Sequence, residues 1–429
     1  MKYIEIEGGH PIRGELAVQG SKNAALPMMA AALLTSQPVV LEGCPQIEDV
    51  RVMCQLLRYV GAEVEEQGAR IKICARQIRN TQLPQNLVSR MRSSIMLMGP
   101  LLSRAGEAGM CFPGGCVIGA RPIDLHLEGL KKLGYEIRED AHCISGWKSK
   151  QSCEWALKNE RPVRRIHLEY PSVGATENII MAGVLEPGET VLTGAAREPE
   201  VRELILMLQQ MGARIEGVNT ERIRICGQPL LNGGCRWVMA DRIVAGTYLI
   251  AAAVTGGEIL LHYVSPEDNV SILKILEDMG CRIAYHEKQQ WIHLRAPKCL
   301  QAVSTITGPY PEFPTDLQAM LVTAMSQAEG ISHMEERVFE NRFRYVEALC
   351  RMGAKVSLQK NRAAVWGKCQ LKGDELWATD LRAGAAMVLA GLCAKGKSRI
   401  YQLDFVERGY ENIASDLFAL GAQVWELNE

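Results

Sequence analysis

The sequence repeats one short pattern six times, and this repetition restricts the possible folds more than any other feature. In each copy a helical pattern ends on a hydrophobic residue, a glycine follows, and an alternating strand pattern comes next. The repeated glycines are Gly61, Gly134, Gly212, Gly280, Gly353 and Gly421, at intervals of 73, 78, 68, 73 and 68 residues. Repetition at a nearly constant period indicates repeated supersecondary units. We therefore expect six copies of one unit, in two groups of three.

Each unit is predicted to contain two kinds of helix, each followed by a strand. An alanine-rich apolar helix comes first, as at residues 243–254 and 381–393, and a short strand follows, as at 257–261. The second helix is amphipathic, as at 270–279, and the repeated glycine ends it in a left-handed conformation. Helices that are apolar on all sides must be buried. We therefore predict an α/β fold in which the alanine-rich helices pack together inside and the sheets face outward.

Two segments depart from the six units. A strand pattern covers residues 3–18 and precedes the first helix, so it is compatible with either group. Residues 147–161 are polar and basic without clear periodicity, which predicts an exposed insertion. Because single cores stop growing at about 250–300 residues, a chain of 429 residues should form at least two domains.

Composition excludes several functional classes. The formal net charge is −1, so no overall positive field attracts nucleic acid. The 14 cysteines include no Cys-x-x-Cys pair and no zinc-type spacing with histidine, so we expect no metal. The apolar runs at 24–34 and 383–393 are shorter than the roughly 20 residues that cross a bilayer, so we expect no membrane insertion. The charged N-terminal strand pattern is not a signal peptide, and scattered cysteines then indicate reduced thiols in the cytoplasm.

Residues 111–125 form the most distinctive loop of the sequence. Two adjacent glycines, Gly114 and Gly115, allow tight turns, and they present the thiol of Cys116. Arg121 adds a cation suited to phosphate or carboxylate. One interpretation is a surface turn with a buried, inert cysteine, since cysteine is often buried. The other is an exposed loop that carries a reactive thiol beside an anion site.

Three further segments open predicted buried helices and carry cations or caps. They are residues 21–24, 89–94 and 171–176, which contain Lys22 and Arg92. Helix N-termini bind anions through free N–H groups and a partial positive charge. The alternative is that Ser21, Ser93 and Ser172 are ordinary N-caps and that the cations are solvated.

The second half of the chain supplies one carboxylate and three arginines. Asp316 lies at the start of the fifth buried helix, where an N-cap would also place an aspartate. Arg342, Arg382 and Arg408 could each form a surface ion pair. Together, however, they indicate a site that holds a phosphate and a carboxylate.

These motifs resemble the UDP-N-acetylglucosamine 1-carboxyvinyltransferase family over almost the whole chain. The matching segments are 21–27, 113–125, 172–176, 196–200, 313–316, 339–343 and 408–410. The resemblance implies an inside-out α/β fold of two domains with three repeats each, and an active site in the cleft between them. It also implies that residues 21–241 form one domain and that residues 1–20 join 242–429 in the other.

The family reaction transfers the enolpyruvyl group of phosphoenolpyruvate to the 3′-hydroxyl of UDP-N-acetylglucosamine, without a cofactor, by addition and elimination. By resemblance, Cys116 is the general acid, Asp316 is the base, and Lys22 and Arg408 are also catalytic. Phosphate is assigned to Lys22, Arg121 and Arg408, the phosphoenolpyruvate carboxylate to Arg342 and Arg382, and the sugar to Asn23. The residues assigned to the UDP-sugar are Arg92, Arg121, Pro122, Ile123, Asp124, Leu125, Ser172, Val173, Gly174 and Val338.

Some features leave alternatives open. Tyr170 stands where some family members have a lysine that reaches the nucleotide, which puts that contact in doubt. The insertion at 147–161 is longer than expected and offers a surface for a regulatory protein partner. A catalytically silent UDP-sugar-binding paralogue with a regulatory role is one alternative function, although the complete set of acid, base and cations argues against it. A fold relative acting on RNA 3′ ends is another, and the neutral net charge argues against it.

Overall fold

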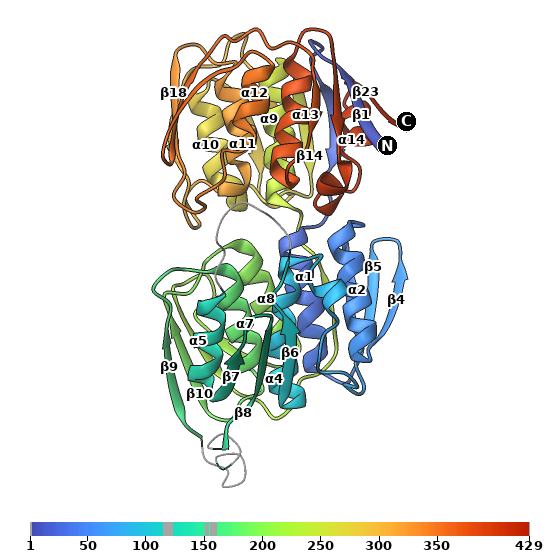
Figure 1. The fold of residues 1–429 in the computed structure, drawn as a ribbon, viewed down its shortest axis with the longest axis vertical. Helices are drawn as coiled ribbons and strands as arrows, with labels where there is room; N and C mark the ends of the chain where they lie inside the picture. The colour runs from blue at the N-terminus through green and yellow to red at the C-terminus, as the bar shows by residue number, and fades with distance from the viewer. Residues whose placement is uncertain (1, 115–122, 151–153, 155–160, 429) are drawn as a thin grey trace. The chain divides into compact units, whose positions relative to one another are not determined.

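The protein was analysed as a computed structural model that describes residues 2–114, 123–150, 154 and 161–428. The described residues divide into two compact units (Figure 1). Unit 1 holds residues 2–19 and 240–428, and unit 2 holds residues 20–114 and 123–239 apart from the undescribed positions. Each unit has its own apolar core.

Unit 2 contains three copies of the repeated element order. The first copy comprises α1 (Lys22–Ala31), η1 (Ala32–Leu34), β3 (Val39–Glu42), α2 (Glu48–Val60), β4 (Glu63–Gln67) and β5 (Arg70–Cys74). The second comprises α3 (Gln85–Val88), η2 (Arg92–Leu97), α4 (Met98–Ala105), β6 (Glu107–Cys111), α5 (Asp124–Leu133), β7 (Tyr135–Glu139) and β8 (Cys143–Lys148). The third comprises β9 (Val163–His167), α7 (Val173–Gly183), β10 (Glu189–Thr193), α8 (Pro199–Gln210), β11 (Arg214–Glu216) and β12 (Arg222–Cys226). Strand β13 (Gly234–Trp237) follows.

Unit 1 contains the other three copies and the first two strands of the chain, β1 (Lys2–Glu7) and β2 (Arg13–Ala17). The fourth copy comprises α9 (Arg242–Thr255), β14 (Glu258–His262), η3 (Glu267–Asn269), α10 (Val270–Asp278), β15 (Arg282–His286) and β16 (Trp291–Arg295). The fifth comprises β17 (Ser304–Ile306), η4 (Thr315–Leu317), α11 (Gln318–Met325), β18 (Ile331–Glu335), α12 (Val346–Arg351), β19 (Lys355–Gln359) and β20 (Arg362–Trp366). The sixth comprises β21 (Glu375–Trp377), α13 (Leu381–Cys393), β22 (Lys397–Tyr401), η5 (Leu403–Arg408), α14 (Ile413–Ala419) and β23 (Gln423–Asn428).

Within the described residues, six sheets correspond to the six copies, three in each unit. In three of them the strand before the buried helix pairs in parallel with the strand after it, as β9 does with β10. The first sheet of each unit obtains this parallel strand from elsewhere in the chain. Strand β13 pairs with β3 in unit 2, and β2 pairs with β14 in unit 1. Each unit is therefore closed by a strand that lies far from its partner in sequence.

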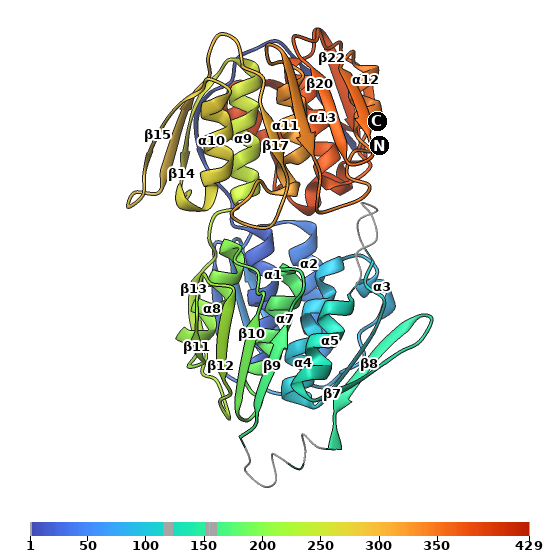
Figure 2. The ribbon, with the colours of Figure 1, turned by 90° about the vertical axis from the view of Figure 1, so that its left-hand side faces the viewer.

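The buried helices occupy the middle of each unit, as the sequence predicts. In unit 1, α9, α11 and α13 contact one another, and strands lie around them (Figures 1 and 2). Nearly every residue of these three helices is buried, whereas α10 buries only its apolar face. The predicted inside-out α/β fold of six repeats is confirmed.

The repeated glycines perform the predicted task at the end of the amphipathic helices. Their φ angles are +112° at Gly61, +106° at Gly134, +101° at Gly212, +95° at Gly280, +110° at Gly353 and +86° at Gly421. Only glycine adopts this left-handed region without strain, so each turns the chain from helix to strand.

Three local expectations need correction. Residues 3–18 do not form one strand, because β1 pairs with β22 and β23 whereas β2 pairs with β14 of another sheet. The segment 89–94 does not begin an α-helix directly, since extended Met91 precedes the 3-10 helix η2. In the predicted insertion, Trp147 and Lys148 belong to β8, and most of the remainder lies outside the described residues.

Candidate functional site

Asp316 in unit 1 is held between two buried arginines. Its Oδ1 accepts a hydrogen bond of 2.6 Å from Arg342 Nη2, and its Oδ2 accepts one of 2.8 Å from Arg382 Nη2. The arginine side chains are only 3% and 7% exposed, whereas that of Asp316 is 28% exposed. We call these three residues the Asp316 group. Its two guanidinium groups are anchored internally, and its carboxylate remains accessible.

Arg382 is positioned by the N-terminus of α13. Asp380 caps this helix by accepting the backbone N–H groups of Arg382 and Ala383. Burial by itself lowers the pKa of Arg382, but the charge of Asp316 and its hydrogen bond raise the pKa above its ordinary value. Buried Tyr410 interacts with the same guanidinium, and its hydroxyl also lies 2.8 Å from that of Thr247. Arg382 therefore stays charged in a fixed orientation.

Arg342 is positioned by the turn that follows β18. Its guanidinium donates to the carbonyl oxygen of Thr315 and lies over the Phe339 ring, 5.6 Å from the centroid. The buried carboxylate of Glu336 accepts the backbone N–H groups of Val338 and Phe339 and the hydroxyl of Thr315. One carboxylate thus connects the segment that carries Arg342 to the segment that carries Asp316.

The structure decides between the alternatives left open for these residues. Asp316 is not the N-cap of η4, because Pro314 occupies that position and the Asp316 carboxylate binds the two arginines. Arg342 and Arg382 are not surface ion pairs, since both are buried. Arg408 and Val338, in the same unit, are half-buried, and Gly409 brings the chain after Arg408 tightly against Leu381 of α13.

Lys22 in unit 2 is anchored by a buried acid. Its Nζ lies 2.5 Å from Asp49 Oδ2, and the side chain of Asp49 is 3% exposed. Lys22 is therefore not simply solvated, although the neighbouring Ser21 is an N-cap that accepts from the backbone N–H of Ala24. Asn23 follows in the first turn of α1 and is half-buried. Asp49 was not predicted, because a carboxylate at the start of an amphipathic helix is common.

The N-terminus of α7 packs closely against two other elements that carry predicted site residues. A side chain at Gly174 would lie 3.0 Å from His126 Cε1 of α5 and from Met96 Cε of η2. Ser172 caps α7 by accepting from the backbone N–H of Ala175. The predicted residues Ile123, Asp124 and Leu125 lie just before His126, and Arg92 and Met96 both belong to η2. The structure therefore brings together three of the segments assigned to one ligand.

Asn178 fixes the orientation of His126. Its Oδ1 accepts from the backbone N–H of Gly99, and its Nδ2 donates to the carbonyl of Ile95. The same Nδ2 lies 3.2 Å from His126 Nδ1, so this ring nitrogen is the acceptor and a neutral ring carries its hydrogen on Nε2. Sequence reasoning missed both residues, because neither stands in a recognisable motif.

The start of the cysteine loop is anchored to α3 and η2. A Cβ at Gly114 would lie 1.8 Å from Ser89 O, so only glycine fits at this position. The backbone N–H of Gly114 donates to Val88 O, and Arg92 Nη1 donates to Pro113 O at 3.5 Å. Cys116, Arg121 and Pro122 lie outside the described residues.

Three buried carboxylates lie at the start of α8 and in α7. They belong to Glu177, Glu198 and Glu200. Burial, and then the charges of Glu200 and Glu198, raise the pKa of Glu177 well above its usual range. The packing around Glu177 therefore favours the protonated form of its carboxyl group.

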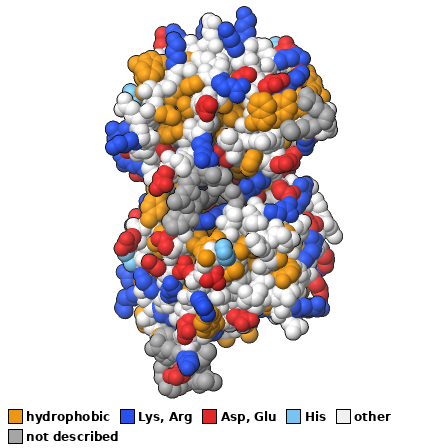
Figure 3. Space-filling view, viewed as in Figure 1, with side chains coloured by type: hydrophobic (Ala, Val, Ile, Leu, Met, Phe, Trp, Pro, Cys, Tyr) orange, Lys and Arg blue, Asp and Glu red, His pale blue; other side chains and the backbone are white. Residues whose placement is uncertain are grey.

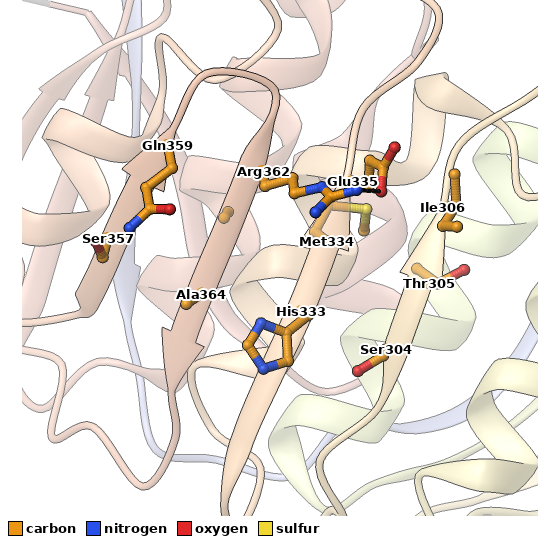
Figure 4. A pocket seen from close by; sticks show the side chains of 11 residues that line it. Ser304, Thr305, Ile306, His333, Met334, Glu335, Ser357, Gln359, Arg362 and Ala364 are labelled. Atoms are coloured by element: carbon orange, nitrogen blue, oxygen red, sulfur yellow. Dashed lines mark ion pairs between the residues drawn. The ribbon is translucent and has the colours of Figure 1, made fainter.

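A hollow of about 610 Å³ lies against the sheet of β17, β18, β20 and β19 in unit 1. Figure 4 shows Arg362 of β20 directed towards Glu335 of β18, and their ion pair measures 3.0 Å. Its lining also includes Ser304 and His333, but none of the predicted site residues. This hollow is therefore separate from the Asp316 group.

The described residues contain no cluster of three or more metal-ligating side chains. No helix in this described part is long and apolar enough to cross a membrane. On the visible face of each unit, basic and acidic side chains are interspersed (Figure 3).

Comparison with known proteins gives consistent results. Residues 6–417 match the family model described as EPSP synthase (3-phosphoshikimate 1-carboxyvinyltransferase). A relative from Caldanaerobacter subterraneus subsp. tengcongensis, named UDP-N-acetylglucosamine 1-carboxyvinyltransferase 1, is 42% identical over 424 residues, which cover 99% of each chain. A UDP-N-acetylglucosamine 1-carboxyvinyltransferase from Koribacter versatilis is 41% identical over 433 residues, covering 100% of this chain and 97% of the relative.

Solved structures share the fold. The enolpyruvyl transferase NikO from Streptomyces tendae has a TM-score of 0.87 at 24% identity, covering 100% of this chain and 99% of NikO. EPSP synthase from Acinetobacter baumannii has a TM-score of 0.75 at 17% identity, with full coverage of both chains.

Proposed function

The chain belongs to the EPSP synthase family and, within it, to the UDP-N-acetylglucosamine 1-carboxyvinyltransferases, and we propose how its residues carry out that reaction. The enolpyruvyl group of phosphoenolpyruvate moves to the 3′-hydroxyl of UDP-N-acetylglucosamine, and phosphate is released. The observation that carries this proposal is the 42% identity to a relative of that name over 99% of both chains. The comparisons do not support a catalytically silent protein, because the relatives reported above are named as transferases.

The first step adds the sugar hydroxyl across the enol double bond. The Cys116 thiol gives its proton to the methylene carbon of phosphoenolpyruvate, and the 3′-oxygen bonds to the adjacent carbon. Asp316 accepts the hydroxyl proton, which suits a carboxylate that is fixed yet 28% exposed. The product of this step is a tetrahedral intermediate that still carries the phosphate.

The second step reverses the proton transfer and expels phosphate. The Cys116 thiolate takes a proton back from the new methyl group, the carbon–carbon double bond forms again, and the bond between carbon and the phosphate oxygen breaks. The phosphate leaves with the bonding electron pair and takes up the proton that Asp316 accepted. The charge that develops on the phosphate is stabilised by Lys22, Arg121 and Arg408. The carboxylate of phosphoenolpyruvate faces Arg342 and Arg382. Residues of both units therefore take part in the proposed reaction.

The UDP-sugar is assigned to the converging segments of unit 2. Ser172, Val173 and Gly174 lie at the N-terminus of α7, where free N–H groups and the helix dipole favour the diphosphate. Arg92 and residues 121–125 complete this side, with Asn23 on the sugar and Val338 contributed by unit 1. Tyr170 is exposed and replaces the lysine of some relatives, so it adds no charge there.

Product analysis tests the proposed reaction. Incubation with phosphoenolpyruvate and UDP-N-acetylglucosamine should yield a nucleotide sugar heavier by one enolpyruvyl group in mass spectrometry. Unchanged UDP-N-acetylglucosamine would contradict the proposal. The product would enter peptidoglycan synthesis in the cytoplasm, and thus cell-wall formation and division.

The role of Cys116 can be tested separately with the epoxide fosfomycin. A reactive thiol beside a phosphate-sized anion site should be alkylated, so peptide mapping should place the adduct on Cys116. Burial raises the pKa of Cys44, Cys54, Cys281 and Cys393 to about 12, so these thiols should remain unlabelled. Labelling at other cysteines, or none, would contradict a specially reactive Cys116.

The variant Cys116→Asp distinguishes proton donation from thiol chemistry. A carboxylic acid can also protonate the methylene carbon, so we expect turnover to persist while fosfomycin no longer inactivates the enzyme. Loss of turnover in a folded variant would show that the reaction needs the sulfur itself.

A further inference from the structure

Two cysteines face each other across neighbouring strands of unit 2. Cys111 is the last residue of β6 and Cys143 is the first residue of β8, and the two are direct partners in the antiparallel register. Both are free thiols. Neither takes part in the proposed reaction.

The hydrogen-bond pattern shows which kind of cross-strand pair they form. At one end of the ladder the N–H of Lys148 donates to Gly106 O, and at the other the N–H of Phe112 donates to His142 O. Hydrogen-bonded and non-hydrogen-bonded pairs alternate along an antiparallel ladder. Cys111 and Cys143, one position from the Phe112–His142 pair, therefore form a non-hydrogen-bonded pair.

This geometry suits a disulfide. Cα atoms of a non-hydrogen-bonded pair lie about 4.5 Å apart, and both side chains project from the same face. Disulfides span Cα separations of roughly 4.4–6.8 Å, so no backbone rearrangement is required. The turn before Cys143 is fixed as well, because Asp140 Oδ1 accepts the backbone N–H groups of His142 and Cys143.

The two thiols differ in their access to a reagent. Cys143 is exposed and Cys111 is half-buried. Burial, and then the nearby charge of Cys143, raise the pKa of the Cys111 thiol. An external reagent should therefore react first at Cys143, and Cys111 should act as the resolving thiol.

We propose that Cys111 and Cys143 form a reversible disulfide site that reacts with low-molecular-weight disulfides such as oxidised glutathione. The Cys143 thiolate attacks one glutathione sulfur, forms a mixed disulfide and releases one reduced glutathione. The Cys111 thiolate then attacks Cys143 Sγ, which forms the protein disulfide and releases the second reduced glutathione. Two protein thiols are oxidised, and one glutathione disulfide is reduced to two thiols.

Peptide mapping of the full-length protein tests the proposal. The protein is incubated with oxidised glutathione, its remaining thiols are blocked, and it is digested with trypsin without reduction. We expect a peptide from residues 139–148 joined to the peptide that contains Cys111, and dithiothreitol should separate them. Because Cys111 and Cys116 share a tryptic peptide, fragmentation must place the link on Cys111.

Variants provide the controls. Cys111→Ser should abolish the link and leave glutathione on Cys143, whereas Cys116→Ser and Cys350→Ser, the latter at another exposed cysteine, should leave the link unchanged. The proposal is overturned if wild-type Cys143 keeps its glutathione, if Cys111 pairs with a different cysteine, or if neither thiol reacts. If a variant fails to fold, the peptide map of the wild-type protein alone tests the disulfide proposal. None of these outcomes depends on the transferase reaction.

Discussion

Asp316 connects two buried charges, so its removal should affect both turnover and stability. In Asp316→Asn, loss of the proposed base should lower kcat by about 10²–10⁴-fold. The guanidinium groups lose a charged acceptor, which should lower the free energy of unfolding by about 1–3 kcal/mol. Steady-state kinetics and urea denaturation measure the two effects.

Asp374 offers a matched control for this variant. It pairs with Arg351 at 2.8 Å, but the arginine side chain is 48% exposed. We expect Asp374→Asn to keep wild-type kcat and to change stability by less than about 1 kcal/mol. Equal losses in the two variants would argue against a special role for Asp316.

Glu177 should make the stability of the protein depend on pH. Its folded-state pKa lies above the ordinary value of 4.5, so the folded protein retains a proton that the unfolded chain releases. Its stabilising contribution is complete below about pH 4.5 and is lost as pH rises through the folded pKa, at about 1.4 kcal/mol per pH unit. Glutamine does not ionise, so the variant Glu177→Gln does not lose stability in this way. Its free energy of unfolding relative to that of wild type should therefore increase with pH.

Urea denaturation at pH 5 and pH 8 measures whether the stability of Glu177→Gln relative to wild type increases with pH. Glu189 provides a control, because a hydrogen bond from Arg224 lowers its pKa and its stabilising contribution is therefore already complete above about pH 4.5. The difference in stability between Glu189→Gln and wild type should be nearly the same at pH 5 and pH 8. A pH-independent difference between Glu177→Gln and wild type would contradict the raised pKa.

At the scale of elements, the close packing of α7 against α5 should affect ligand binding. In Gly174→Ala the new methyl group lies 3.0 Å from His126 and Met96, so α7 or His126 must shift. We expect KM for UDP-N-acetylglucosamine to rise about tenfold, equivalent to about 1.4 kcal/mol, with a smaller change in kcat.

The same helix contains a suitable control. A methyl group at Gly183 would have Ile225 Cδ1 as its nearest neighbour at 3.4 Å, which is close to an ordinary contact. Gly183→Ala should therefore leave KM unchanged. A rise in KM for both variants would indicate a general disturbance of α7.

Sequence patterns predicted helices and repeats well because both depend on local periodicity. The predicted helix 381–393 coincides with α13, and the glycines at the helix ends have the expected positive φ. Strand partners were harder to predict from the sequence, because the pairing of β13 with β3, for example, joins segments nearly 200 residues apart. For the same reason, the motif resemblance named Asp316, Arg342 and Arg382, but only the structure revealed their shared ion pairs and the buried anchor Asp49.

At the scale of the whole molecule, the chain alternates between its two units. Strand β2 lies before α1 in sequence but completes a sheet of unit 1, and β13 lies before α9 but completes a sheet of unit 2. Each unit therefore depends on a strand from beyond its own three repeats. The chain therefore starts in unit 1, forms unit 2 and returns to unit 1, and the proposed reaction draws residues from both units.

The central claim is that the chain transfers an enolpyruvyl group from phosphoenolpyruvate to a UDP-sugar. Phosphate release measures this most directly, because the elimination step frees one phosphate for each group transferred. We predict rapid release from phosphoenolpyruvate only when UDP-N-acetylglucosamine is present, with one phosphate per enolpyruvyl product. Release that is independent of the nucleotide sugar, or no release with both substrates present, would contradict the account.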